Sequence, residues 1–198
     1  DLSDLSTLPT LVERATAEFG RLDIVVNNVG GSFPRPLLET SPAMFEKAFH
    51  FNVTTALELS KAAIPAMLAS DPAGGSIVNI SSAIGRLTDR GFAAYGTAKG
   101  ALTHLTRLMA TECAPRVRVN AIAVGSTATS ALDMVLADDN LRTTMETNTP
   151  LRRLGEPLDI ALGVLYLCSP AGSYLTGKIL EIDGGLNAPN LMLGLPDL

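Results

Sequence analysis

Three side chains in the middle of the sequence have the types and spacing of a proton-transfer device. Tyr95 and Lys99 are four residues apart, and Ser82 precedes Tyr95 by thirteen residues. A phenol has an ordinary pKa of about 10, so it needs assistance to exchange a proton near neutral pH. Because residues four apart share one face of a helix, we expect the Lys99 ammonium to lie beside the phenol and lower the pKa of Tyr95. We expect Ser82 to donate a hydrogen bond to a substrate oxygen as charge develops there.

The surrounding segments predict where these residues lie. Residues 74–82 read GGSIVNISS, which is typical of a buried strand that ends in two hydroxyl side chains. The apolar residues that follow Tyr95 recur with helical spacing up to Cys113, at Ala98, Ala101, Leu102, Leu105, Leu108 and Met109. A serine at the carboxyl end of a strand and a Tyr/Lys pair at the start of the next helix would meet where open α/β sheets bind their ligands.

Helical and strand patterns alternate along the rest of the chain. Further helices are predicted for 7–19, 41–68 and 157–168, and further strands for 23–27, 118–122 and 179–183. Such alternation indicates right-handed crossovers and a mostly parallel, doubly wound α/β sheet covered on both faces. The looser segment 127–151 follows a strand's carboxyl end, where we expect a substrate loop or lid. We expect the tail, residues 187–198, to pack on a neighbouring surface.

Composition restricts the classes of partner. With 198 residues, 46% of them apolar, the chain is expected to form one globular domain. Its net charge of −5, without a Lys/Arg cluster, disfavours nucleic acid and anionic membranes as partners. No apolar run approaches the ~18 residues of a membrane span. The spacing of a metal site is not found among the cysteines and histidines, which are Cys113, Cys168, His50 and His104. Two unpaired thiols suit a reducing cytoplasm. We therefore expect a cytoplasmic protein without a metal.

Several motifs resemble those of the short-chain dehydrogenase/reductase family, and the likeness extends over essentially the whole chain. Residues 27–30 (NNVG) resemble the family's Asn-Asn-Ala-Gly, with Val29 in place of alanine. Residues 123–129 (AVGSTAT) resemble its nicotinamide-contacting segment, with Val124 where proline is common and Thr127 where Ile or Val is. Residues 174–177 (YLTG) and 183–185 (DGG) resemble its C-terminal signature. The resemblance implies a Rossmann-like fold and a homo-oligomer, a tetramer or a dimer.

The resemblance also implies an activity and residue roles. The activity is NAD- or NADP-dependent interconversion of a secondary alcohol and a ketone, with a small-molecule substrate. Tyr95 would be the general acid/base, Lys99 its pKa tuner and a ribose contact, Ser82 the donor to the substrate oxygen, and Asn52 the anchor of a proton relay. The implied cofactor contacts run from the adenine to the carboxamide: Asp1, Leu2, Asn28, Gly30, Tyr95, Lys99, Gly125, Thr127 and Thr129.

One family motif is absent from the sequence, since no Gly-x-x-x-Gly-x-Gly occurs in it. In the family this turn and the following helix hold the pyrophosphate. Residue 1 is expected to fall at the end of the third strand, so two βα units, on the order of 60 residues, would precede it. Residues 1–198 would then form the C-terminal portion of one Rossmann-like domain. The choice between NAD and NADP, normally set at the end of the second strand, stays open.

Three functional alternatives stay open at this point. Residues 28–36 and 149–155 are most similar to bacterial 7α-hydroxysteroid dehydrogenases, which suggests a bulky apolar alcohol as substrate. A 3-oxoacyl-carrier-protein reductase is the alternative within the family, and its phosphopantetheine substrate would favour a basic entrance. The alternative from another class is a truncated, non-catalytic oligomerisation module. Arg86 and Arg90, between Ser82 and Tyr95, would meet either an acidic substrate or solvent.

Overall fold

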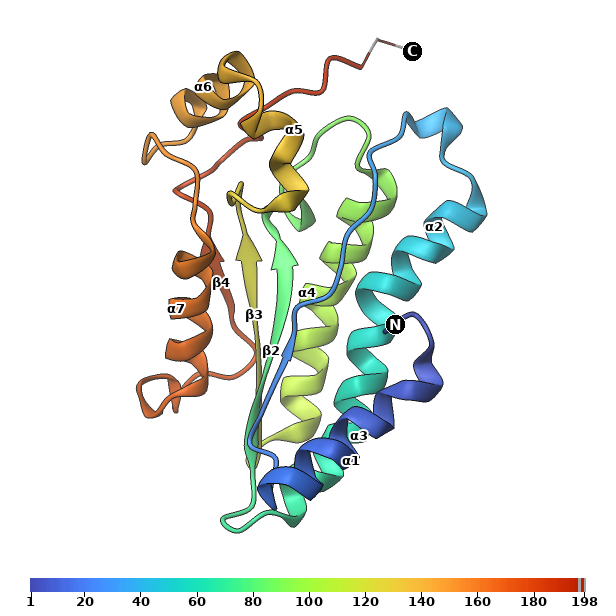
Figure 1. The fold of residues 1–198 in the computed structure, drawn as a ribbon, viewed down its shortest axis with the longest axis vertical. Coiled ribbons are helices and arrows are strands. Elements are labelled where there is room, and N and C mark those ends of the chain that lie inside the picture. The colour runs from blue at the N-terminus through green and yellow to red at the C-terminus, as the bar shows by residue number, and fades with distance from the viewer. Residues whose placement is uncertain (196, 198) are drawn as a thin grey trace.

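The computed structural model describes residues 1–195 and 197, and it shows a parallel sheet covered by helices on both faces (Figure 1). The sheet consists of β1 (Ile24–Asn27), β2 (Gly75–Ser82), β3 (Val117–Val124) and β4 (Ile179–Ile182), which lie side by side in chain order. Every pairing is parallel. The carboxyl ends of all four strands therefore meet at one edge, and the predicted α/β fold is confirmed.

One face of the sheet is covered by α1 (Leu8–Phe19), α3 (Thr55–Ala69) and α4 (Ala93–Cys113). The core on this face contains Ala63 and Met67 from α3, Met109 from α4, and Ile77 and Val119 from the strands. The predicted first helix is confirmed. It ends at Gly20, whose φ of 71° is the left-handed conformation that glycine adopts without steric cost.

The opposite face is covered by α7 (Pro157–Cys168), which packs with Val78, Ile122 and Leu167. The β2–β3 crossover contains α4, the β3–β4 crossover contains α7, and both move to the next strand in the same direction across the sheet. Because α4 and α7 lie on opposite faces, the two crossovers have opposite handedness. The expectation of uniformly right-handed crossovers was therefore wrong. The β3–β4 connection is long and carries α5 (Asp133–Leu136) and α6 (Asp139–Asn148), which allows the chain to change faces.

Strand β1 is buried on one face only. Val25 and Asn27 are buried, whereas Ile24 and Val26 keep 47% and 38% of their surface exposed. Helix α7 packs on β2, β3 and β4, and no helix among the described residues covers the same face of β1. The expectation of a sheet covered on both faces was therefore wrong for β1.

The predicted helix 41–68 forms as three consecutive segments. Ser41 caps α2 (Pro42–Phe49) by accepting a hydrogen bond from the Met44 N–H at 3.3 Å. A π-helical turn, His50–Thr54, then leads into α3. The sequence predicted the span but not this turn, which carries Asn52. Single π turns within helices occur often at functional sites.

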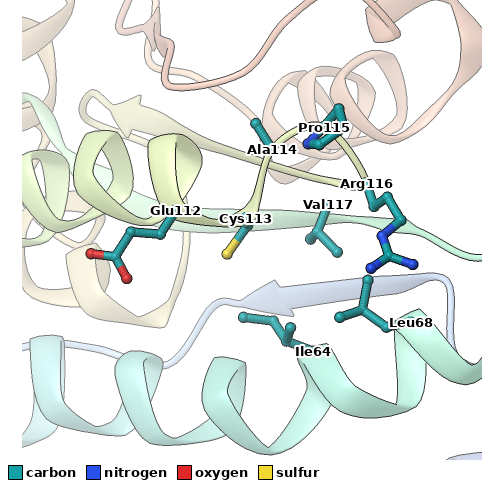
Figure 2. Close-up of a pocket in the computed structure, with 8 residues that line it drawn as sticks. All are labelled: Ile64, Leu68, Glu112, Cys113, Ala114, Pro115, Arg116 and Val117. Atoms are coloured by element: carbon teal, nitrogen blue, oxygen red, sulfur yellow. The ribbon is translucent and has the colours of Figure 1, made fainter.

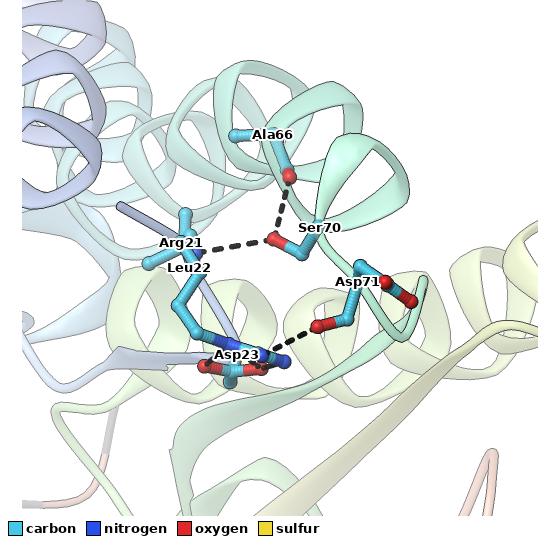
Figure 3. A network of polar contacts seen from close by, with 6 residues as sticks. All are labelled: Arg21, Leu22, Asp23, Ala66, Ser70 and Asp71. Carbon is cyan, nitrogen blue, oxygen red and sulfur yellow. Dashed lines mark hydrogen bonds and ion pairs between the residues drawn. The ribbon is translucent and has the colours of Figure 1, made fainter. Parts of the chain in front are cut away.

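A polar network fixes the amino end of β1 against the end of α3 (Figure 3). The Ser70 hydroxyl donates to the Ala66 carbonyl at 3.0 Å and accepts from the Leu22 N–H at 3.3 Å. The Arg21 guanidinium pairs with Asp23 at 2.6 Å and donates to the Asp71 carbonyl at 2.7 Å. These bonds set the start of the strand whose other end reaches the candidate site.

Candidate active site

Ser82 is the last residue of β2, and a 3-10 turn, Ala83–Gly85, carries the chain from it back onto α4. The Ser82 hydroxyl accepts a hydrogen bond from the Ile84 N–H at 3.4 Å. A Cβ at Gly85 would lie 3.0 Å from the Lys99 carbonyl carbon and from the Gly100 nitrogen. The absence of a side chain at Gly85 therefore allows the turn to lie against α4 and brings Ser82 to that helix.

Tyr95 lies in the first turn of α4, half-buried beside Phe92. Burial raises the pKa of Tyr95 above its ordinary value of 10.0, and a hydrogen bond with the Ser82 side chain acts in the opposite direction. The sequence predicted a lowered pKa, and that direction was wrong for this structure. Desolvation of the phenolate dominates, and the Lys99 Nζ lies over the ring, 5.7 Å from its centroid.

The Lys99 ammonium is held by the backbone of β2. Its Nζ donates to the Ile80 carbonyl at 2.9 Å, and the Ser81 hydroxyl donates to the Lys99 carbonyl at 3.0 Å. Only 3% of Lys99 is exposed, and burial lowers the pKa of its ammonium to about 8. An ammonium has three donors, so Lys99 can also donate to a ligand.

Asn52 fixes the turn that follows β1. Its side-chain oxygen accepts from the Gly31 N–H at 2.9 Å, and its Nδ2 donates to the Gly31 carbonyl at 3.0 Å and to the Ala48 carbonyl at 2.8 Å. A Cβ at Gly30 would lie 2.6 Å from both the Asn52 Oδ1 and the Lys99 Nζ. Gly30 therefore lies between Asn52 and Lys99, and the four predicted catalytic residues converge from β2, α4 and the π turn.

The residues predicted to contact a cofactor lie on four segments, of which α4 carries Tyr95 and Lys99. Gly125 follows β3 and donates its N–H to the Ile182 carbonyl at 3.0 Å, so this loop is joined to the end of β4. Thr127 is buried and forms a bridge with Gly155, whereas Thr129 is exposed. Asn28 and Gly30 are exposed at the end of β1.

The N-terminal turn with Asp1 and Leu2 is attached to the π turn. The Asp1 carboxylate accepts from the Ser3 hydroxyl at 2.6 Å, and the His50 Nε2 lies 2.8 Å from the Ser3 carbonyl oxygen. His50 belongs to the π turn that also carries Asn52. The N-terminal turn therefore contacts the element on which the predicted relay residue lies. His50 thus has a structural contact here, and His104 is exposed.

A buried amide network under the site was not predicted. The Asn27 Nδ2 donates to the Asn79 Oδ1 at 2.7 Å, and the Asn79 Nδ2 donates to the Thr106 hydroxyl at 2.9 Å. This network joins β1, β2 and α4. Asparagine in two otherwise apolar strands was the signal that could have revealed it, since buried amides require partners.

Arg86 and Arg90 are bound by residues near the C-terminus. The Arg86 Nη2 lies 2.6 Å from the Asp183 carboxylate and 3.0 Å from the Glu181 carboxylate. Arg90 donates to the Leu195 carbonyl at 2.7 Å and pairs with Asp197. Both guanidinium groups therefore have partners within the chain, and both side chains remain partly exposed.

Two cavities lie apart from the converging polar groups. One of about 320 Å³ is at the amino ends of the strands, lined by Ile64, Leu68 and residues 112–117 (Figure 2). Another of about 620 Å³ lies between α7 and the end of β4 and includes Ser126 and Thr127. Neither is lined by the four predicted catalytic residues, so hydrogen bonding rather than a cavity identifies the site.

The described part of the chain offers neither a metal cluster nor a membrane span. No group of three His, Cys, Asp or Glu side chains within it is placed to share a metal ion. None of its helices combines the length and apolar character needed to cross a bilayer.

Comparison with known proteins shows the family of this chain. A family model described as enoyl-(acyl carrier protein) reductase matches residues 1–187. An uncharacterized oxidoreductase of Mycobacterium tuberculosis is 60% identical over 198 residues, which are 100% of this chain and 75% of the relative. The 7α-hydroxysteroid dehydrogenase of Escherichia coli K12 is 37% identical over 93% of this chain and 71% of its own length.

The chain belongs to the short-chain dehydrogenase/reductase family. A solved structure of a 7α-hydroxysteroid dehydrogenase, complexed with NADH and 7-oxo glycochenodeoxycholic acid, superposes with a TM-score of 0.89. It is 36% identical in sequence, and the match covers 97% of this chain and 73% of that one. The predicted family and the Rossmann-like fold are therefore confirmed, and the protein is related to oxidoreductases that include hydroxysteroid dehydrogenases.

Proposed function

We propose that the protein interconverts a secondary alcohol and a ketone with NAD or NADP as cofactor. The observation that carries this proposal is the convergence of Ser82, Tyr95 and Lys99 where β2 ends. The Lys99 Nζ lies 5.7 Å from the centroid of the Tyr95 ring, and the backbone of the strand that ends at Ser82 holds the ammonium. Family membership and the hydroxysteroid dehydrogenase relatives support it.

The protonated state of the Tyr95 phenol suits ketone reduction. A phenol with a raised pKa is protonated at neutral pH, so it can donate its proton to the substrate oxygen as that oxygen gains charge. Ser82 would donate a hydrogen bond to the same oxygen. Alcohol oxidation needs the phenolate instead, and the positive charge of Lys99 favours its formation.

The residues present fit the nicotinamide nucleoside of such a cofactor. The buried Lys99 ammonium is bound to a carbonyl rather than to a carboxylate in the described structure, which leaves it able to donate to ribose hydroxyls. Tyr95 would share the ribose contact, and Gly125, Thr127 and Thr129 would hold the carboxamide. Asn28, Gly30, Asp1 and Leu2 would contact the adenosine side. When bound, the cofactor supplies or accepts the hydride.

A bulky apolar alcohol is the substrate class that we favour. The relatives named 7α-hydroxysteroid dehydrogenase support it, and residues 127–151, with α5 and α6, would form the lid over such a substrate. A 3-oxoacyl-carrier-protein substrate would favour free cationic side chains near the entrance. Arg86 and Arg90 are instead paired with Asp183, Glu181 and Asp197, which disfavours that alternative.

The decisive experiment compares Tyr95→Phe with wild type. Turnover is followed by nicotinamide absorbance with a panel of hydroxysteroids and with an acetoacetyl thioester, each with NAD(H) and NADP(H). We expect Tyr95→Phe to lose activity by about 10²–10⁴-fold because it lacks the proton route. Tyr174→Phe is the matched control, since Tyr174 is fully exposed. Unchanged turnover in Tyr95→Phe would defeat the assignment.

We also propose that the protein works as a homo-oligomer, a tetramer or a dimer, in the cytoplasm. The two free cysteines, Cys113 and Cys168, suit a reducing compartment. Light scattering on the purified protein measures the assembly directly. An oligomer that binds no cofactor and converts no member of the panel would favour the non-catalytic module instead.

A further inference from the structure

The C-terminal segment, residues 187–195, crosses the carboxyl edge of the sheet and touches several loops of the candidate site. Figure 1 shows it passing α6 and α5 on its way to the C-terminus. At its far end, Arg90 donates to the Leu195 carbonyl, and a Cβ at Gly91 would lie 3.1 Å from the Leu195 side chain and 3.2 Å from that of Pro34. The predicted packing of the tail is confirmed for these residues, whereas Pro196 and Leu198 lie outside the described ones.

Asn190 is the buried anchor of this segment. Only 5% of it is exposed, and both ends of its amide are used. Its Oδ1 accepts from the Ser126 hydroxyl at 2.8 Å, while its Nδ2 donates to the Thr149 hydroxyl at 2.9 Å and to the Met145 carbonyl at 3.4 Å. Its backbone carbonyl also accepts from the Asn148 Nδ2 at 3.1 Å.

The hydrogen-bond partners of the Asn190 amide belong to two different parts of the site. Ser126 lies in the loop after β3, directly before Thr127, whereas Met145, Asn148 and Thr149 form the end of α6 in the lid region. Thr149 is itself buried and donates to the Met145 carbonyl at 2.8 Å. One side chain therefore joins the end of the lid to the loop that precedes Thr127. A buried amide with satisfied partners favours a single arrangement of the elements that it joins.

We propose that Asn190 is a positioning residue that fixes the lid helix α6 against the Ser126 loop and so sets the affinity for substrate. This proposal rests on the proposed function, because it assigns segment 127–151 to the substrate. Asn190 makes no contact with Tyr95 or Ser82 in the described structure, so it acts on the lid rather than on proton transfer. Loss of its amide would release α6 and weaken binding of a substrate that the lid covers, while chemistry in the bound complex would continue.

The test compares Asn190→Ala with Asn187→Ala in the purified protein. Asn187 is an exposed amide on the same segment, three residues earlier, and serves as the matched control. The first readout is steady-state kinetics with a 7α-hydroxysteroid and saturating cofactor. We expect Asn190→Ala to raise the substrate KM about tenfold or more, with kcat within about twofold of wild type. Asn187→Ala should behave as wild type.

The second readout is amide hydrogen exchange, which does not depend on activity. In Asn190→Ala, exchange of residues 139–149 should accelerate about tenfold, while β2 and β3 remain protected. If Asn190→Ala fails to fold, Ser126→Ala removes only the hydroxyl donor and should shift both readouts in the same direction.

Three results have distinct meanings. Unchanged exchange in α6, or a reduced kcat with an unchanged KM, overturns the role of Asn190. Equal effects of Asn190→Ala and Asn187→Ala overturn it as well. Inactivity of the intact protein, including any chain that precedes residue 1, overturns the proposed function instead, and the exchange measurement then still decides whether Asn190 fixes α6.

Discussion

The Lys99 Nζ donates a 2.9 Å hydrogen bond to the backbone carbonyl of Ile80, two residues before Ser82 on the same strand. The strand that carries the candidate hydroxyl donor thus also holds the ammonium. The Ser81 hydroxyl donates to the Lys99 carbonyl, so two hydrogen bonds, one from each element, join α4 to β2. The position of the ammonium is therefore set by backbone structure and does not require a bond to Tyr95.

The buried ammonium predicts a specific pH dependence of stability. In the folded state the pKa of Lys99 is lowered from 10.5 to about 8 by burial, so between these pH values the unfolded chain binds more protons. The free energy of unfolding should therefore rise as pH increases from about 8 to above 10, by up to roughly 3 kcal/mol for this group. Denaturant unfolding at several pH values measures it.

Lys99→Met provides the reference for this measurement, because it keeps an unbranched side chain without the charge. Its stability advantage over wild type should be largest below pH 8 and should shrink as pH rises. A difference between the two proteins that does not change with pH would show that Lys99 titrates as an ordinary exposed lysine.

The raised pKa of Tyr95 predicts late ionisation of this phenol. Because burial dominates over the hydrogen bond from Ser82, the phenolate should form only above the ordinary pKa of 10.0 in the absence of cofactor. An ultraviolet difference titration of wild type against Tyr95→Phe isolates this one tyrosine among three. A midpoint below 10 would restore the expectation, drawn from the sequence, that Lys99 dominates the phenol.

Most of the fold could be predicted from local patterns. Pro157–Cys168 and Leu8–Phe19 follow apolar periodicity and end signals within one residue of expectation, because such helices are determined by nearby residues. The Ser82, Tyr95 and Lys99 positions could be predicted for the same reason, since Ser82 ends a well-patterned strand and the other two lie in the first two turns of a well-patterned helix. The coarse location of the candidate site thus followed from the order of strands and helices.

What the sequence did not predict depends on distant contacts. The π turn at Asn52 is stabilised by the amide's bonds to Gly31, which is 21 residues away in the chain. The direction of the Tyr95 pKa depends on burial by the assembled site, and the exposure of Ile24 and Val26 depends on which helices cover β1. The side of the sheet chosen by α7 likewise has no local signal. Each of these is a tertiary property that residue spacing does not encode.

Gly30→Ala should lower kcat strongly while changing the free energy of unfolding only slightly. The added Cβ would lie 2.6 Å from the Lys99 Nζ, at the end of a long side chain, and 2.6 Å from the Asn52 Oδ1, which would lose its hydrogen bond from the Gly31 N–H. The fold should therefore lose only about 1 kcal/mol, comparable to one hydrogen bond. The displaced ammonium should lower kcat about tenfold or more. Val29→Ala, at the neighbouring exposed position, is the control and should leave both quantities near wild type. A large loss of stability with normal kcat would contradict this view of Gly30.

Asn79→Ala should have the opposite profile and act mainly on stability. Asn79 is fully buried and joins Asn27 of β1 to Thr106 of α4, so its removal leaves polar groups without one partner and opens a small void. The expected loss is about 2–3 kcal/mol in the free energy of unfolding, measured by denaturant unfolding at neutral pH. Asn187→Ala, an exposed amide, should change stability by less than about 0.5 kcal/mol. Equal stabilities of the two variants would mean that the buried amide network contributes little to holding β1, β2 and α4 together beneath the site.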